Sequence, residues 1–138
     1  MTAIRRGGAD DLDAVAAIQQ ASPGAARWNV ADYLDREFLV AVDRNRVVGF
    51  LVTRTLAADE REILNLAVAP DFRRKGVARV LLGSAFEAFR GCVFLEVRES
   101  NGVAQKFYKS LGFKGLSKRK RYYDNPPETA IVMKFHSC

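Results

Sequence analysis

Histidine and cysteine are scarce in this sequence, and their scarcity limits the chemistry that the chain can perform. The 138 residues include one histidine, His136, and two cysteines, Cys92 and Cys138. A single histidine argues against histidine-based catalytic triads and against multi-histidine metal sites. Acid–base chemistry must therefore come from carboxylate, tyrosine, lysine or cysteine side chains, and we expect no bound metal.

Neither a disulfide framework nor a membrane span is expected. Two cysteines are too few for such a framework. Cys92 begins an apolar stretch and should be a small buried hydrophobic residue, and Cys138 should be a free thiol. No apolar run approaches the length of a signal peptide or of a transmembrane helix. We therefore expect a soluble, cytoplasmic protein without a membrane partner.

The length and the net charge leave several kinds of partner open. A chain of 138 residues fits a single domain, residues 1–138, with a substantial core. The net charge of +6 favours an anionic partner, which could be a phosphorylated cofactor, an acidic peptide or nucleic acid. An ordinary solvated face explains this charge equally well, so composition alone selects none of these partners.

The periodicity of the apolar residues predicts a single α/β sheet. The expected strands cover residues 2–5, 38–42, 47–55, 63–68, 92–97, 113–123 and 129–135, and the expected helices cover about 12–21, 30–36, 76–89 and 101–111. Three consecutive strands favour antiparallel pairing, and the later strand–helix–strand order favours a parallel pair. We therefore expect a mixed sheet with helices on both faces.

Local signals mark several helix ends. Asp10 or Asp11, Asn29 and Asn101 are the expected N-caps, because their side chains can accept hydrogen bonds from helix N–H groups. Gly112 is the expected left-handed residue after the last helix.

A basic turn between an apolar strand and a helix is the first candidate site. It lies within residues 63–83, ILNLAVAPDFRRKGVARVLLG. The first N–H groups of a helix have no partner inside it, and together with the helix dipole they form an anion site. Gly76 permits close approach to a phosphate, small Ala78 keeps the first helical turn open, and positive charge comes from Arg73, Arg74, Lys75 and Arg79.

This turn is neither a Walker A sequence nor a G-x-G-x-x-G fingerprint. A solvent-facing basic helix start explains its spacing equally well.

Glu96 and Tyr108 are the candidate acid–base residues. Glu96 lies in the apolar segment Cys-Val-Phe-Leu-Glu-Val, where a carboxylate is costly unless it is paired or hydrated. It could act as a general base, or it could lie at a sheet end in water or paired with Arg98. Tyr108 lies on the next expected helix beside an apolar stripe. It could donate a proton into a cleft, or it could be a core residue whose hydroxyl binds the backbone.

Two further features have simpler explanations. Asn101 is first of all an N-cap. The basic segment could contact nucleic acid, but it lacks the interleaved aromatic residues of a single-strand binder, and alternation on an exposed strand accounts for it as well. Its residues are Lys114, Lys118, Arg119, Lys120 and Arg121. Nucleic acid is therefore not an expected partner.

Taken together, these residues resemble the GNAT (Gcn5-related) N-acetyltransferases. Within that family the sequence looks most like the ribosomal-protein alanine N-acetyltransferase (RimI-type) subfamily. Four segments carry the resemblance: LNLAVAPDFRRKGVARVLL, LEVRESNGVAQKFYKSLGF, KRKRYY and AARWNVADYL. The resemblance covers nearly the whole chain in the order of its elements.

The resemblance implies a fold and a cofactor. The GNAT fold (acyl-CoA N-acyltransferase) is one mixed, mostly antiparallel sheet with a central, splayed parallel pair. The family pattern Arg/Gln-x-x-Gly-x-Gly/Ala implies that the backbone of the turn wraps the pyrophosphate of acetyl-CoA. Its first, fourth and sixth positions fall on Arg73, Gly76 and Ala78. The implied cofactor-binding residues are Leu66, Ala67, Val68, Arg73, Arg74, Lys75, Gly76, Val77, Ala78, Arg79, Asn101 and Tyr108.

The resemblance also implies catalytic roles. Glu96 falls at the position of the family's general base, and Tyr108 at that of its general acid. The strand Leu66 to Val68 would lie along the pantetheine and splay from the strand Leu95 to Val97. The backbone N–H of Leu66 or Val68 would then polarise the thioester carbonyl. The amine attacks directly, so neither a metal nor a covalent enzyme intermediate is implied.

The function implied is an acetyl-CoA-dependent N-acetyltransferase that acts on a protein N-terminal α-amine, possibly that of a ribosomal protein. Acetylation of a small polyamine, antibiotic or amino acid is an alternative, as is a CoA-binding module without turnover. Two departures bear on the choice. Ala78 replaces the second glycine of the motif, and the loop before Thr129 contains Pro126-Pro127 and one acid, Glu128. The sequence does not identify the acceptor. It also does not distinguish a monomer from a homodimer.

Overall fold

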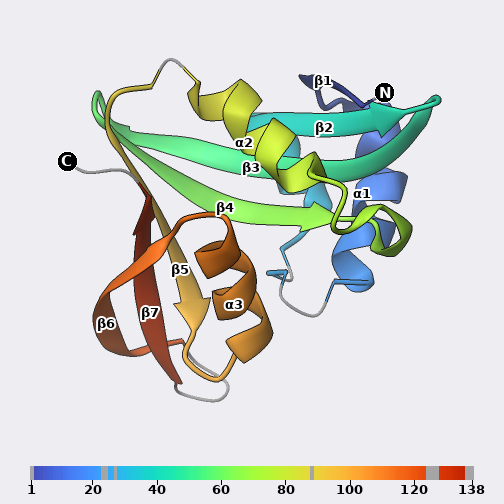
Figure 1. Ribbon diagram of the computed structural model, residues 1–138. Helices are drawn as coiled ribbons and strands as arrows, with labels where there is room; N and C mark the ends of the chain where they lie inside the picture. The colour runs from blue at the N-terminus through green and yellow to red at the C-terminus, as the bar shows by residue number, and fades with distance from the viewer. Residues whose placement is uncertain (1, 23–24, 27, 88, 124–127, 136–138) are drawn as a thin grey trace. The chain divides into compact units, whose positions relative to one another are not determined.

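The computed structural model describes residues 2–22, 25–26, 28–87, 89–123 and 128–135, with the backbone alone at 120–123. In chain order the elements are β1 (Ala3–Arg6), η1 (Ala9–Asp11), α1 (Leu12–Gln20), η2 (Val30–Asp35), β2 (Glu37–Asp43), β3 (Arg46–Ala57), β4 (Glu60–Val68), η3 (Pro70–Phe72), α2 (Val77–Phe86), β5 (Cys92–Arg98), α3 (Gly102–Ser110), β6 (Lys114–Tyr123) and β7 (Glu128–Phe135), where η marks a 3-10 helix (Figure 1). The predicted order of strands and helices is confirmed.

The strands form one mixed sheet, as predicted. Its order is β1-β2-β3-β4-β5-β7-β6. The pairs β1–β2, β2–β3, β5–β7 and β6–β7 are antiparallel. The pair β4–β5 is parallel, with Glu60–Glu62 opposite Cys92–Phe94, and α2 makes the crossover that such a pair requires. The chain forms two compact units, which are described separately: unit 1 is Met1–Arg54 with Ile63–Phe89, and unit 2 is Thr55–Glu62 with Arg90–Cys138.

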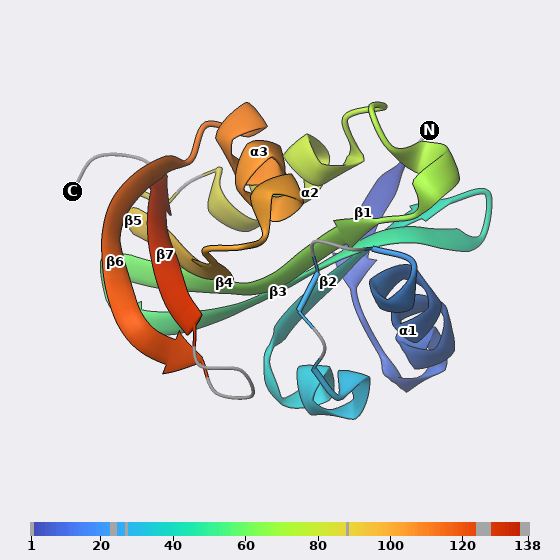
Figure 2. The same cartoon turned by 90° about the horizontal axis from the view of Figure 1, so that it is seen from below.

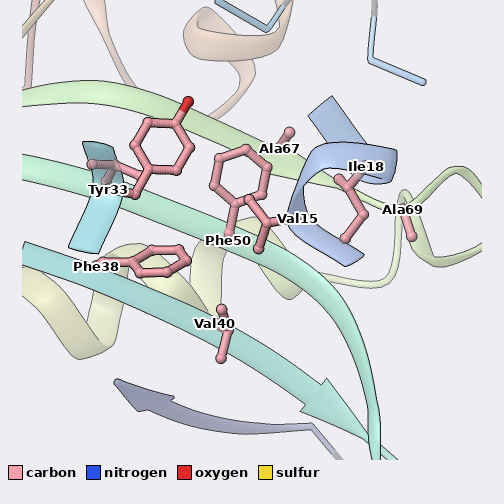
Figure 3. Packing of buried hydrophobic residues seen from close by; sticks show 9 residues of the cluster. Val15, Ile18, Tyr33, Phe38, Val40, Phe50, Ala67 and Ala69 are labelled. Carbon is pink, nitrogen blue, oxygen red and sulfur yellow. The ribbon is translucent and has the colours of Figure 1, made fainter. Parts of the chain in front are cut away.

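The core of unit 1 lies between α1 and one face of its strands. Aromatic rings fill its centre, and the Tyr33 ring lies 5.8 Å from the rings of Phe38 and Phe50 (Figure 3). Burial of such large apolar side chains supplies much of the stability of a small domain. The buried members of this cluster are Val15, Ile18, Tyr33, Phe38, Val40, Phe50, Val52, Ala67 and Ala69.

Helix α2 packs on the opposite face of unit 1, so the expectation of helices on both faces is confirmed (Figure 2). Gly49 on β3 makes this packing close. A Cβ atom at Gly49 would lie 3.1 Å from Val77 and 3.4 Å from Leu81, both on α2, and 3.2 Å from the Ala67 carbonyl. A side chain at this position would therefore push α2 away from the strands.

Unit 2 packs α3 on one face of β5 and β7 through aromatic rings. The Phe113 ring, which follows α3, lies 5.7 Å from Tyr108 and 5.3 Å from Phe135 on β7. Gly112 has φ of +103°, as expected for the residue that ends the helix, and a Cβ there would lie 2.8 Å from Phe135. Both conformation and space therefore favour glycine at this position.

The structure differs from two local predictions. The Asn29 side chain caps the 30–35 segment as expected, but that segment is a 3-10 helix. Cys92 is buried, as expected for a small hydrophobic residue, but it is also disulfide-bonded, which we did not predict. Disulfide pairing depends on distances that the fold sets, and composition does not report them. The predictions for His136, Cys138 and the loop 124–127 lie outside the described residues. None of the described helices is long and apolar enough to cross a membrane.

A bidentate ion pair at the start of unit 1 makes stability depend on pH. The Arg5 guanidinium donates two hydrogen bonds of 2.8 Å to the buried carboxylate of Asp11, which also accepts one of 2.8 Å from the Gly8 N–H. The hydrogen bond from Arg5 is the main cause that lowers the pKa of Asp11. Because the folded state then binds the proton less tightly than the unfolded state, this stabilisation is present at neutral pH and lost on acidification.

We therefore expect Asp11→Asn to lower the free energy of unfolding by about 1 to 3 kcal/mol at pH 7. The difference from the wild type should shrink as the pH falls below about 4, where the carboxyl becomes protonated in the unfolded chain. Chemical denaturation at pH 7 and pH 3 measures this, with Asp13→Asn on the exposed face of α1 as the control. An equal loss at both pH values would show that charge is not the cause.

Candidate functional site

The predicted turn of unit 1 has the backbone geometry of an anion site. Arg74 and Gly76 have φ of +64° and +80°, on either side of Lys75, and Gly76 is the N-cap of α2. Left-handed residues in such a turn aim successive N–H groups toward one point. The first N–H groups of α2 lack acceptors inside the helix, so they add to the same concave surface. A Cβ at Gly76 would meet nothing within 4 Å, so the space beside the turn is open there.

The side chain of Arg73 holds the turn in place. Its Nε donates to the Val68 carbonyl at 3.1 Å, and its Nη2 donates to Ser22 Oγ at 3.1 Å and to the Ala21 carbonyl at 3.2 Å. This guanidinium therefore binds the ends of β4 and α1. Arg74, Lys75 and Arg79 are exposed as well and add further positive charge.

The end of β4 presents its backbone in a defined direction. The Ala69 N–H donates to the Val48 carbonyl on β3 at 2.8 Å. Since successive N–H groups of an extended chain alternate in direction, those of Leu66 and Val68 point away from β3. The Leu66 N–H already donates to Asn65 Oδ1 at 3.1 Å. Of the two predicted donors, Val68 is therefore the better candidate.

Glu96 lies on β5 with its side chain 15% exposed, and its recorded partner is Arg119 on β6. Arg119 Nη1 lies 2.5 Å from Glu96 Oε1. The pairing of Glu96 with Arg98, which the sequence suggested as an alternative, is wrong.

Arg98 instead lies 3.3 Å from Glu128, whose other oxygen accepts from the Ser100 N–H at 2.6 Å. The hydrogen bond from Ser100 is the main cause that lowers the pKa of Glu128.

Tyr108 and Glu96 belong to opposite faces of the strands in unit 2. Tyr108 is buried, and it packs against Phe113, whose ring contacts Phe135 on the face that α3 covers. Phe135 is opposite Val93 in the register, and side chains on a strand alternate between faces. Val93, Leu95 and Val97 therefore face α3, and Glu96 faces away from it. The structure brings the two candidate residues to the same strands, but from opposite sides.

The remaining predicted residues have structural roles. Asn101 Oδ1 accepts from the Ala104 N–H at 3.1 Å, so it is the N-cap of α3 as expected. The basic segment forms two ion pairs: Lys118 lies 2.8 Å from Glu99, and Arg119 pairs with Glu96. Within the described residues, no group of three or more histidine, cysteine, aspartate or glutamate side chains could hold a metal ion.

Sequence reasoning missed two sets of residues. Arg119 was predicted only as part of a basic segment, and not as the ion-pair partner of Glu96. The buried amides Gln19 and Asn65, which bind one another at 3.0 Å, were not singled out. A polar residue within an otherwise apolar strand, Ile-Leu-Asn-Leu-Ala-Val, is the signal that could have indicated Asn65.

Comparison with known proteins identifies the class. The model of the acetyltransferase (GNAT) family matches residues 12–113, which is most of the chain. The chain therefore belongs to the GNAT family, and it is an acetyl-CoA-dependent N-acetyltransferase.

The relatives of the chain indicate a subfamily within the GNAT family. The chain is 36% identical over 110 residues to the ribosomal protein bS18-alanine N-acetyltransferase of Haemophilus ducreyi, a match that covers 75% of this chain and 73% of the relative. It is 40% identical over 95 residues to the enzyme of that name from Salmonella typhimurium, and this match covers 64% of each. The resemblance to ribosomal-protein alanine N-acetyltransferases that we drew from the sequence is confirmed.

Solved structures agree with this assignment. The ribosomal-protein-S18-alanine N-acetyltransferase of Escherichia coli superimposes with a TM-score of 0.75 at 28% identity, covering 98% of this chain and 93% of that one. Ard1 from Thermoplasma volcanium superimposes with a TM-score of 0.81 at 32% identity, covering 96% and 95%. Arabidopsis thaliana NAA60, solved with acetyl-CoA, shares the fold with a TM-score of 0.77 at 18% identity, covering 99% and 100%.

Gly76→Ala tests the turn. A left-handed conformation costs an L-residue about 1 to 2 kcal/mol, while the added methyl group would meet no atom within 4 Å. The substitution therefore strains the turn without a clash, and we expect acetyl-CoA to bind about tenfold more weakly by isothermal titration calorimetry. Gly83→Ala in the same helix, where a Cβ also meets nothing within 4 Å, is the control and should bind normally. Equal affinities for the two variants would contradict the role of the turn.

Proposed function

We propose that this chain, as one catalytic domain, transfers the acetyl group of acetyl-CoA to the α-amine of a protein N-terminus. The acceptor class we favour is a ribosomal-protein terminus that begins with alanine, as the names of its relatives suggest. The observation that carries the proposal is the placement of Glu96 and Tyr108 on opposite faces of the same strands. A base on one face and an acid on the other suit a reaction in which the attacking amine loses a proton on one side and the departing thiolate gains a proton on the other.

The cofactor contacts follow from the two ends of the strand-to-helix segment. The N–H groups from Arg74 to Arg79 would bind the pyrophosphate, helped by the exposed charges of the turn. The backbone Leu66 to Val68 would lie along the pantetheine. Asn101 would lie near the cofactor while it caps α3. This assignment is supported by the left-handed turn and by the outward direction of the Val68 N–H.

The chemistry then needs three proton transfers, two from the nitrogen and one to the thiolate. The α-ammonium of a peptide has a pKa of about 8, so near neutral pH it must lose a proton before it can attack. Glu96 would accept that proton, directly or through one water molecule. The amine nitrogen forms a bond to the thioester carbon, the Val68 N–H stabilises the oxyanion, and the C–S bond then breaks. Tyr108 would donate its proton to the leaving thiolate, and the second proton that the nitrogen loses as the amide forms would return to the tyrosinate through solvent.

The acceptor can be tested directly. We expect a synthetic peptide with N-terminal alanine to gain one acetyl group on its first residue and to release one equivalent of free CoA, detected by mass spectrometry and a thiol assay. The same peptide with a blocked N-terminus is the control and should not react, even if it contains lysine. Turnover of polyamines, antibiotics or free amino acids, with none of the peptide, would favour a small-molecule acceptor. Binding of acetyl-CoA without CoA release on any amine would favour a binding module.

Substitution of the two acid–base residues tests the mechanism. We expect Glu96→Gln to lower kcat by about 100-fold or more and Tyr108→Phe by about tenfold or more, because each loses one proton-transfer group. The KM for acetyl-CoA should change little in Glu96→Gln. Steady-state kinetics with the alanine peptide give both constants.

Glu99→Gln is the matched control for Glu96→Gln. It removes a carboxylate three residues further on that also pairs with a basic residue of β6, Lys118. Normal turnover in Glu96→Gln, or an equal loss in both variants, would remove Glu96 from the base role.

A further inference from the structure

We propose that Arg119 is a positioning residue for catalysis: it holds the Glu96 carboxylate through Oε1, so that Oε2 is directed toward the acceptor amine. The inference rests on the proposed role of Glu96 as the base. It adds a residue from a strand that is not adjacent to β5 in the sheet. Nothing in the basic composition of the segment around Arg119 indicates this role.

The register of three strands places the two side chains on one face. Glu96 on β5 is opposite Val132 on β7, and Ala130, two residues away on β7, is opposite Arg119 on β6. Residues directly opposite one another, and residues two apart on one strand, share a face of the sheet. Glu96 and Arg119 therefore both point away from α3, on the side where the proposed proton transfer from the amine takes place.

Arg119 must reach across an intervening strand to make this contact. Strand β7 lies between β5 and β6, so the two backbones are about two strand spacings, roughly 10 Å, apart. A long side chain is needed to cover this distance. Ala130 is fully buried between Arg98 and Arg119 in the register, and its small side chain leaves room for the stem of Arg119 to cross.

The contact fixes the orientation of the carboxylate. Glu96 is largely buried, whereas Arg119 is 54% exposed. A mostly buried carboxylate needs a partner, and a charged hydrogen bond to one oxygen restricts the rotation of the group. Among the described residues, the recorded hydrogen bond of Glu96 uses Oε1, and the other oxygen can serve as the proton acceptor. Arginine remains protonated throughout, so it does not compete for the proton.

The neighbouring pair offers a matched control. Lys118, the next residue on β6, binds Glu99 at 2.8 Å and is similarly exposed, at 63%. Lys118 is opposite Ile131 in the register, so its Cβ lies on the other face of the sheet from that of Arg119. A general effect of removing a positive charge from β6 should appear in Lys118→Met, whereas an effect through Glu96 should not.

The test compares kcat and KM in four variants with the full chain, acetyl-CoA and the N-terminal alanine peptide. We expect Arg119→Met to lower kcat by about 10- to 100-fold, the size typical of a misplaced catalytic group, with the KM for acetyl-CoA changed by less than about twofold. Arg119→Lys should restore part of kcat, since an ammonium can make the same single contact. Lys118→Met should behave as the wild type. In the Glu96→Gln background, Arg119→Met should cause no further loss.

The outcomes separate this inference from the proposed function. If Glu96→Gln is inactive while Arg119→Met turns over normally, the positioning role is wrong and the base assignment stands. The role is also wrong if the losses in the double variant are additive, or if the KM for the peptide alone changes. If Glu96→Gln keeps full turnover, the base role of Glu96 and the positioning role of Arg119 both fail, while acetyl transfer to the peptide stands. Because Arg119→Met leaves the largely buried Glu96 carboxylate without this partner, it should also lower the melting temperature, and kinetics measured well below the melting temperature of each variant keep the loss of kcat separate from unfolding.

Discussion

The buried amide of Asn65 is the interaction on which the functional end of unit 1 depends. Its Oδ1 accepts from the N–H groups of Ala26 and Leu66, and its Nδ2 lies within hydrogen-bond distance of Gln19, Ala26 and Tyr33. Burial of an amide costs free energy unless its hydrogen bonds are formed. A displacement of any one partner would break hydrogen bonds in the network, so the network holds all of the partners in place. The network lies directly before the backbone that is proposed to align the thioester. It therefore orders β4 more sharply than apolar packing alone would do.

Unit 2 depends on a different constraint, the alternation of side chains along β5. Leu95 and Val97 face α3, while Glu96 between them faces the other side. A shift of the register by one residue would bury the carboxylate under α3 and expose two apolar side chains. The aromatic contacts of Phe113 with Tyr108 and Phe135 oppose such a shift, because they join α3 to one register of β7. The packing of the helix therefore keeps Glu96 on the face opposite Tyr108.

Local features were predictable from the sequence because they depend on near neighbours. The left-handed Gly112 and the caps Asn29 and Asn101 each depend on residues only a few positions away. The partner of Glu96 could not be found in this way. Arg119 is 23 residues distant and reaches β5 only because β7, the last strand in the chain, inserts between β5 and β6. The disulfide at Cys92 and the hydrogen bonds of Arg73 to Val68 and Ser22 likewise follow from tertiary distances, which composition and spacing do not report.

The pairing of charges makes one of the two basic regions of the chain, the turn before α2 and strand β6, the better candidate for binding an anion. A net charge of +6 could have been concentrated on β6, where it would favour an extended polyanion. The structure instead pairs Arg119 with Glu96 and Lys118 with Glu99, so part of the charge on β6 is balanced locally. The turn before α2 combines exposed basic side chains with helix N–H groups that lack acceptors within the helix. An ordered, compact anion is better matched to this turn than to β6, because converging N–H groups select shape as well as charge. The turn is therefore the better candidate of the two for the anionic cofactor, and on that proposal the net charge does not require an acidic acceptor.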